Sequence, residues 1–211
     1  MKITKFGHCC LLIEEKGLRI LTDPGSYSTA QNEVENIDVI LITHEHADHI
    51  HIPSLKNCIK NNPQARIITN KGVAKMLDAE GIKYELVEHG HKTAIQGVLI
   101  EGFGEKHAEM YKTITPVINT GYFVSNRLFY PGDSFYNPKK NVEILALPVA
   151  GPWMKLSEAI DYALEIHPKK CFPVHEGILK TPGTTHKILG DVLPQHGINF
   201  IILEEGKETE F

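Results

Sequence analysis

The strongest constraint on the fold is an apolar run, residues 38–43, that leads directly into the motif His-x-His-x-Asp-His. An almost continuous apolar run of this length is typical of a strand buried on both faces. In an extended chain residues i and i+2 share a face, so His44 and His46 can converge on one metal ion. Asp48 and His49 follow as the chain turns away, and they can face a second position. The sequence therefore predicts a metal centre at the end of a buried strand.

The ligand types narrow the choice of metal. Imidazole and carboxylate groups without thiolate suit Zn²⁺, and also Mn²⁺ or Fe²⁺. No Cys-x-x-Cys pattern occurs among the four cysteines, so a zinc site built from thiolates is not expected. Cys9 and Cys10 are neighbours that point to opposite faces of a strand. Cys58 and Cys171 lie in apolar segments and are interpreted as small buried side chains.

Three further ligand-type residues follow predicted strands. His107 comes after the strand ending at Phe103, Asp133 follows Leu128 to Tyr130, and His175 follows Lys170 to Val174. Loops at strand ends carry function in layered α/β folds, so these side chains complete the predicted centre. His89 and His91 lie in a nearby turn and are alternatives to His107.

The rest of the chain alternates strand-like and helix-like segments. Strands are predicted at 2–6, 9–14, 18–22, 38–43, 66–69, 82–88, 97–103, 117–124, 128–130, 143–147, 170–174 and 198–203. Helices are predicted at 52–61, 71–79, 156–166 and 185–193, with Ser157 as an N-cap, and residues 124–128 are predicted to form a hairpin turn. Two β-rich blocks that both carry helices indicate an α/β (α+β) fold. We expect a single domain, residues 1–211, with two packed sheets and helices outside them.

Composition excludes several classes of function. The chain has 22 Lys and Arg against 26 Asp and Glu, a formal net charge of −4, so nucleic acid is not an expected partner. The longest apolar stretch, residues 144–151, is far shorter than the roughly 20 residues of a membrane span, so no membrane association is expected. The N-terminal residues contain no apolar signal core, which predicts a cytoplasmic location. The sequence is compatible with a homo-oligomer and does not predict one.

The order His-x-His-x-Asp-His, then His, then Asp, then His resembles the metallo-β-lactamase superfamily, and the resemblance extends over essentially the whole chain. The segments Gly7-His8, Leu21-Thr22-Asp23-Pro24 and Pro173-Val174-His175 are similar to a small branch that includes the L-ascorbate-6-phosphate lactonase-like hydrolases. The resemblance implies a four-layer αββα sandwich with a dinuclear metal site. It also implies that Asp23 lies behind the ligands and that His8 lies near the site without being a ligand. The resemblance assigns His44, His46 and His107 to the first metal, Asp48, His49 and His175 to the second, and Asp133 to a bridging position.

These roles imply a metal-dependent hydrolase with two divalent ions, of which zinc is favoured. A hydroxide held by both metals would attack a small ester-like substrate, such as a lactone, phosphodiester or thioester, with Asp48 and Asp133 as the catalytic carboxylates. The two ions, two carboxylates and hydroxide leave about one positive charge, which favours an anionic substrate. Ser134 lacks the setting of a nucleophile and is interpreted as a turn residue.

Two other functions are weighed against hydrolysis. A mononuclear-iron sulfur dioxygenase is the first alternative, and a non-catalytic metal-binding protein is the second. Metal content separates them, since two zinc or manganese ions favour hydrolysis and one iron favours oxygenation. Side chains that could contact substrate are Trp153 and Met154 as walls, and Lys106, Tyr111, Tyr136 and His186 as orienting groups.

Overall fold

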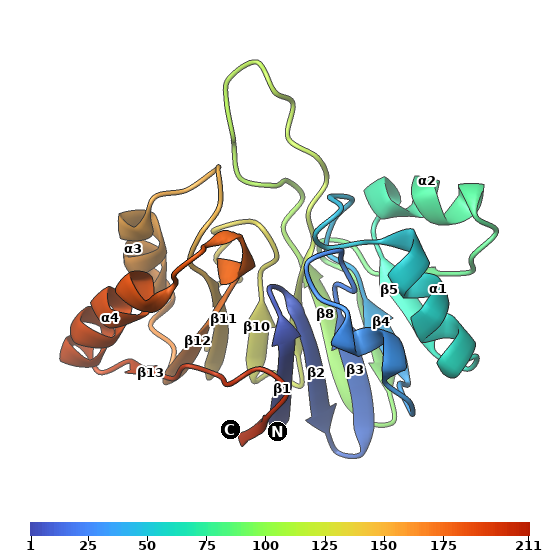
Figure 1. Ribbon diagram of the computed structural model, residues 1–211, viewed down its shortest axis with the longest axis horizontal. Helices are drawn as coiled ribbons and strands as arrows, with labels where there is room; N and C mark the ends of the chain where they lie inside the picture. The colour runs from blue at the N-terminus through green and yellow to red at the C-terminus, as the bar shows by residue number, and fades with distance from the viewer.

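Two seven-stranded sheets form the centre of the protein in the computed structural model, which describes residues 1–211 (Figure 1). The first sheet has the order β14-β1-β2-β3-β4-β5-β6 and the second has the order β13-β12-β11-β10-β9-β8-β7. The strands of the first sheet are β1 Lys2–Gly7, β2 Cys10–Glu15, β3 Leu18–Thr22, β4 Val39–Leu41, β5 Arg66–Thr69, β6 Glu85–Leu86 and β14 Glu208–Glu210. The strands of the second sheet are β7 Lys92–Ile95, β8 Val98–Phe103, β9 Gly121–Val124, β10 Leu128–Tyr130, β11 Ile144–Pro148, β12 Lys170–Val174 and β13 Asn199–Phe200.

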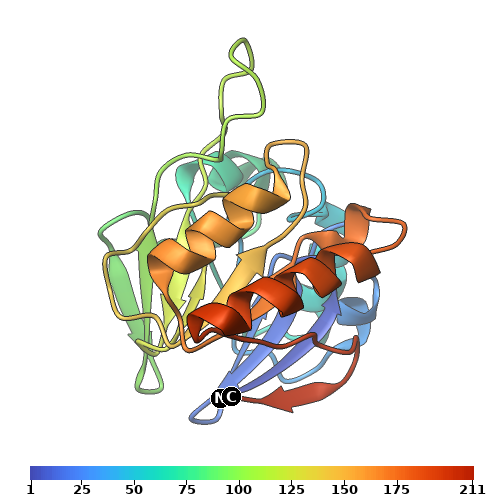
Figure 2. The same cartoon turned by 90° about the vertical axis from the view of Figure 1, so that its left-hand side faces the viewer.

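Helices cover the outer face of each sheet. In Figure 1 α1 and α2 lie outside the first sheet, and Figure 2 shows α3 and α4 lying across the second. The predicted αββα sandwich is therefore confirmed. The longest helix has 11 residues, and no helix has the length and apolar character to cross a membrane. The helices are α1 Ile52–Asn61, α2 Lys71–Ala79, α3 Leu156–Ile166 and α4 Gly183–Val192, and the 3-10 turns are η1 Ala30–Glu33, η2 Glu176–Ile178 and η3 Leu193–His196.

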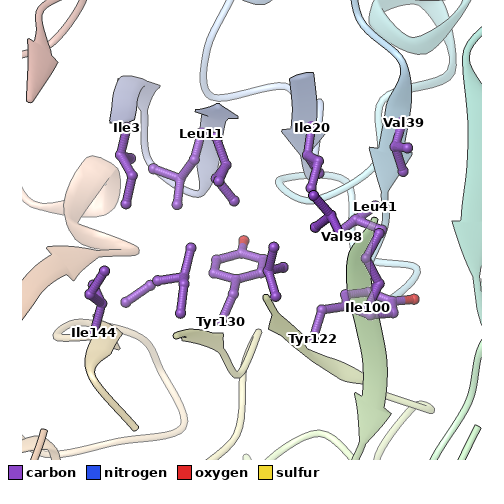
Figure 3. Close-up of a cluster of buried hydrophobic side chains, with 14 of the residues drawn as sticks. Ile3, Leu11, Ile20, Val39, Leu41, Val98, Ile100, Tyr122, Tyr130 and Ile144 are labelled. Carbon is purple, nitrogen blue, oxygen red and sulfur yellow. The ribbon is translucent and has the colours of Figure 1, made fainter. Parts of the chain in front are cut away.

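The main hydrophobic core lies between the two sheets. Figure 3 shows Ile3, Leu11 and Ile20 of the first sheet facing Tyr130 and Ile144 of the second, and all five are fully buried. Full burial of an aliphatic or aromatic side chain stabilises the folded state by about 1.5–3 kcal/mol. This interface therefore fixes how the sheets, and the loops at their ends, lie relative to one another.

The adjacent residues Cys9 and Cys10 lie in different layers of the fold. Cys9 belongs to the core between the sheets, whereas Cys10 belongs to the cluster beneath α1 and α2. The prediction that they point to opposite faces is confirmed. All four cysteines are buried and none forms a disulfide.

Parallel strands bring several loops to one edge of the sandwich. Strands β3, β4 and β5 run parallel in the first sheet, as do β10, β11 and β12 in the second. The long loop between β8 and β9 projects from this edge in both views (Figures 1 and 2). The predicted ligands lie in the loops that follow β4, β8, β10 and β12.

Several boundaries differ from the predictions. Strands β7 and β14 were not expected, because their Lys-Thr-Ala-Ile and Glu-Thr-Glu sequences are those of exposed edges. The expected strands 82–88, 117–124 and 198–203 contract to β6, β9 and β13. Ser157 is not an N-cap, since α3 begins after Lys155, whose backbone N–H donates to Glu158. The hairpin at 124–128 is confirmed, and Ser125 and Asn126 take the positive φ values that its tight turn requires.

Candidate metal centre

A pocket of about 220 Å³ opens among the loops at this edge. Of the seven predicted ligands, His44 and His49 are fully buried behind it. The other five line the pocket directly: His46, Asp48, His107, Asp133 and His175. The structure therefore brings all seven predicted side chains to one place.

The first cluster consists of His44, His46, His107 and Asp133. Each offers one ligand atom, and these atoms lie within 4.8 Å of one another. The Nε2 atom of His44 is 3.1 Å from Nδ1 of His46, and Nε2 of His107 is 3.3 Å from Oδ2 of Asp133. Three imidazoles and a carboxylate at this separation are a donor set suited to Zn²⁺.

The alternatives to His107 lie elsewhere. His89 and His91 line a separate pocket beside Lys71 and Glu88. The Nδ1 atom of His89 accepts a hydrogen bond from the backbone N–H of Gly104. The geometry thus favours the prediction that named His107.

The second cluster differs from the predicted set. It consists of His8, Cys9, His49 and His175, and again one ligand atom from each lies within 4.8 Å of the others. Asp48 lies beside this cluster, with Oδ2 3.1 Å from Nε2 of His8 and 3.4 Å from Nε2 of His175. From the sequence, no cysteine was expected here, and His8 was expected only near the site. The pair Gly7-His8 before a strand indicated that this turn lies near the site. Nothing in the sequence pattern distinguished Cys9 from a core residue.

Asp133 lies between the two clusters. Its Oδ1 is 3.1 Å from Nε2 of His49, and its Oδ2 is 2.8 Å from Nε2 of His175. The indole N–H of Trp153 also donates to Oδ2 at 2.9 Å. The carboxylate therefore faces imidazoles of both clusters, as a bridging ligand must.

Orphaned polar atoms show that the residues fit metal ions. The Nε2 atoms of His49 and His175 and Oδ1 of Asp133 are buried and have no hydrogen-bond partner. Yet Nε2 of His49 is 3.1 Å from Oδ1 of Asp133, and Nε2 of His175 is 2.8 Å from Oδ2 of the same carboxylate. Buried polar atoms in folded proteins are almost always paired. A shared cation would satisfy all three at once, so the donor set fits a metal centre.

Hydrogen bonds on the far side of the rings fix which nitrogen faces the centre. Nδ1 of His49 donates to Oδ2 of Asp23 at 2.7 Å, and Nδ1 of His107 donates to the carbonyl oxygen of Ala108 at 2.6 Å. Both rings thereby present an Nε2 lone pair to the cluster, which is the usual arrangement at metal sites. Asp23 is fully buried behind the ligands, where the resemblance implied.

Thr43 is a supporting residue that the motif did not reveal. Its backbone N–H and hydroxyl both donate to Asp23, at 2.8 and 2.7 Å. Its carbonyl oxygen accepts hydrogen bonds from the Asn70 side chain and from the Thr120 backbone, so it ties the motif to α2 and β9. Thr43 therefore fixes the strand end from which His44 projects.

Two of the clustered groups, His44 and Asp133, are held in the charge states of metal ligands, whereas neighbouring acidic groups raise the pKa of His49 and His175 against the effect of burial. Burial, reinforced by the neighbouring imidazole of His49, holds the pKa of His44 well below its usual value. Burial opposes ionisation of Asp133, but His49, His107 and His175 outweigh it and hold the pKa of this carboxyl well below its usual value. Neutral imidazole and ionised carboxylate are the forms that bind metal.

The predicted substrate-contacting residues have mixed outcomes. Trp153 lines the pocket, whereas Met154 packs in the apolar cluster beside α3. The Ser134 hydroxyl donates to the carbonyl of Pro131 and so behaves as a turn residue. Lys106, Tyr111, Tyr136 and His186 do not line the pocket, and the residues that line it unexpectedly are Tyr27, Ala47, Met110, Pro152 and Ile178.

A family model described as a β-lactamase superfamily domain matches residues 2–175, a span that contains all seven predicted ligands. The chain belongs to the β-lactamase superfamily. Protein Rv0786c of Mycobacterium tuberculosis is 32% identical over the full length of both chains. The UPF0173 metal-dependent hydrolase MJ1163 of Methanocaldococcus jannaschii is 25% identical over 82% of this chain and 83% of its own. A crystal structure of a Parabacteroides distasonis protein superimposes with a TM-score of 0.80 at 26% identity, covering 96% of this chain and 92% of that protein.

These similarities confirm the predicted superfamily, fold and enzyme class. The chain is a metal-dependent hydrolase, as the UPF0173 relatives and the Parabacteroides distasonis protein are named. The narrower resemblance to lactonase-like hydrolases stays a prediction.

Proposed function

We propose that the protein hydrolyses a small, anionic, ester-like substrate with two divalent metal ions, preferably zinc. The observation that carries the proposal is the position of Asp133 between two clusters of buried ligand-type side chains. The first ion would be held by His44, His46 and His107, the second by Asp48, His49 and His175, and Asp133 would contact both.

When bound, such a pair of ions lowers the pKa of water to about neutral and polarises a carbonyl or phosphoryl oxygen. The protein's own residues prepare the pocket for this chemistry. Asp48 Oδ2 accepts a hydrogen bond from Nε2 of His8, which turns the carboxylate toward the pocket it lines. Asp133, held by the indole of Trp153, presents its other oxygen toward His49.

The size and lining of the pocket support the proposed substrate class. A volume of about 220 Å³ suits a small molecule. Two divalent cations outweigh the charges of Asp48 and Asp133, so the pocket favours an anionic group at the metals. The apolar part of the substrate would lie against Tyr27, Trp153 and Ile178, which line the same pocket. Lactones, phosphodiesters and thioesters with a short apolar portion meet these conditions.

The test is hydrolysis by protein stripped of metal and then reconstituted with zinc, manganese or iron. We expect activity on at least one of the three ester classes, and we expect it to depend on the added metal. Asp48→Asn should lower kcat by 100-fold or more, since it removes the charge of a carboxylate at the reacting centre, whereas Glu109→Gln, on the projecting loop, should act like wild type. Fully loaded protein that hydrolyses none of these classes would contradict the proposal.

A further inference from the structure

We infer that Cys9 is a ligand of the second metal, which it would bind through its thiolate beside His49 and His175. The inference rests on the proposed function and adds a donor type that the predicted ligand set lacks. Cys9, His8, His49 and His175 each place one ligand atom within 4.8 Å of the others, and all four residues are at most 2% exposed.

The backbone holds Cys9 at this position. It follows His8, which takes a left-handed conformation with φ of 48° at the turn between β1 and β2. The carbonyl oxygen of Cys9 accepts hydrogen bonds from the hydroxyls of Thr22 at 2.9 Å and Tyr130 at 3.0 Å. Both neighbours are fully buried, so the residue cannot withdraw from the cluster without breaking two buried hydrogen bonds.

The imidazoles around Cys9 point to a missing partner. Nε2 of His49, both ring nitrogens of His175 and Nδ1 of His8 are buried without a hydrogen-bond partner. His49 already donates its Nδ1–H to Asp23, so its remaining nitrogen offers a lone pair. A cation among these nitrogens would satisfy them, and the Cys9 sulfur lies within the same group.

The adjacent cysteine shows what a structural thiol looks like in this chain. Cys10 lies on the opposite face, in the apolar cluster with Leu21, Ile40 and Leu55. No pair of ligand-type imidazoles surrounds it, and it belongs to neither cluster of metal-binding groups. Cys10 therefore provides a matched control for Cys9.

A thiolate would change the properties of the second position. Soft sulfur ligands favour Zn²⁺ and disfavour Mn²⁺ and Mg²⁺ relative to a set of imidazoles and carboxylates. The thiol gives up its proton when the metal binds, which adds a third negative charge to those of Asp48 and Asp133. We therefore expect the second position to discriminate against manganese more strongly than the first.

Cobalt(II) tests this inference directly, because a thiolate bound to cobalt produces a near-ultraviolet charge-transfer band that imidazole and carboxylate ligands do not. The full chain is stripped of metal and loaded with cobalt, and bound cobalt is counted by mass spectrometry. We expect two cobalt ions with the charge-transfer band in the wild type and in Cys10→Ala. Cys9→Ser should lose the band, retain the visible cobalt bands of the first position, and bind its second ion at least tenfold more weakly.

The outcomes separate the two proposals. Two bound cobalt ions without a charge-transfer band in the wild type would overturn the role of Cys9 and leave the dinuclear site intact. A band that survives in Cys9→Ser would also overturn it. Failure of the wild type to bind cobalt at all would contradict the proposed function, and the inference with it. The wild-type spectrum tests whether Cys9 binds the metal even if Cys9→Ser does not fold.

Discussion

At the scale of single residues, Asp133 determines whether the two clusters form one site. Its two oxygens lie within about 3.3 Å of imidazole nitrogens from both clusters. Removing a bridging ligand weakens both metals, whereas removing a ligand of one cluster weakens one. The effect of replacing Asp133 on metal binding is therefore best compared with the effect of replacing one of the histidines that it contacts.

We expect Asp133→Ala to lose both metals together and His175→Ala to lose chiefly the second. The reason is that Asp133 faces both clusters, while His175 belongs only to the second. Metal titration of the two variants, followed by counting of bound ions, checks this. Retention of one tightly bound ion in Asp133→Ala would argue against a bridging role.

The single tryptophan positions Asp133. The Trp153 indole donates to Oδ2 at 2.9 Å, and its ring packs against Phe135. Trp153→Phe keeps an aromatic ring but removes the donor, so we expect metal affinity to fall by about 10–100-fold, as for other outer hydrogen bonds. Competition against a chelating dye measures this, with Phe135→Leu as a control that alters packing but not the hydrogen bond. Equal affinities for Trp153→Phe and wild type would remove the indole from the site.

At the scale of elements, the site depends on loops that pack backbone against backbone. An added Cβ at Gly25, after β3, would lie 1.8 Å from the carbonyl oxygen of Asp48 in the loop after β4. Only glycine allows these loops to approach so closely. The contact keeps Asp48 and His49 at the edge of the first sheet, next to the β1–β2 turn.

Gly25→Ala should therefore destabilise the fold by about 3 kcal/mol and weaken metal binding, because one loop must move away. Gly183→Ala is the control, since no atom lies within 4 Å of its added Cβ. Urea denaturation measures both. A Gly25→Ala protein as stable as the control would mean that the loops can separate without consequence.

The bounds of the helices and strands show what sequence patterns can predict. The helices α1, α2 and α3 and the strands β5, β10 and β12 have the predicted bounds. Each of these helices has a periodic apolar face, and each of these strands is a short, almost continuously buried run. Edge strands β7 and β14 lack such a face and form only through pairing with β8 and β1. The predicted ligands were recognisable because each follows a strand. The positions of Cys9 and Thr43 depend on contacts between segments far apart in the chain, which no local pattern contains.

At the scale of the whole molecule, the metal centre joins the two sheets. His44 and His49 follow a strand of the first sheet, whereas Asp133 and His175 follow strands of the second. Bound metal would therefore connect the sheets at one edge, in addition to the hydrophobic core between them (Figure 3).

Metal removal should lower thermal stability. A ligand at 100 times its Kd stabilises the native state by about 2.7 kcal/mol. For a chain of 211 residues, this corresponds to a fall in Tm of about 5–10 °C on chelation. Scanning calorimetry with and without zinc measures the shift, and Asp133→Ala should show almost none. A wild type whose Tm does not respond to zinc would contradict a link between the sheets.

The proposed function requires two metal ions in one pocket, and the metal content of the protein shows whether they are bound. The measurement is the number of metal ions per chain, determined by plasma mass spectrometry on zinc-reconstituted protein purified without a metal-affinity column. We expect two zinc ions per chain. A single iron that zinc does not displace, or no bound metal after reconstitution, would contradict the proposed function.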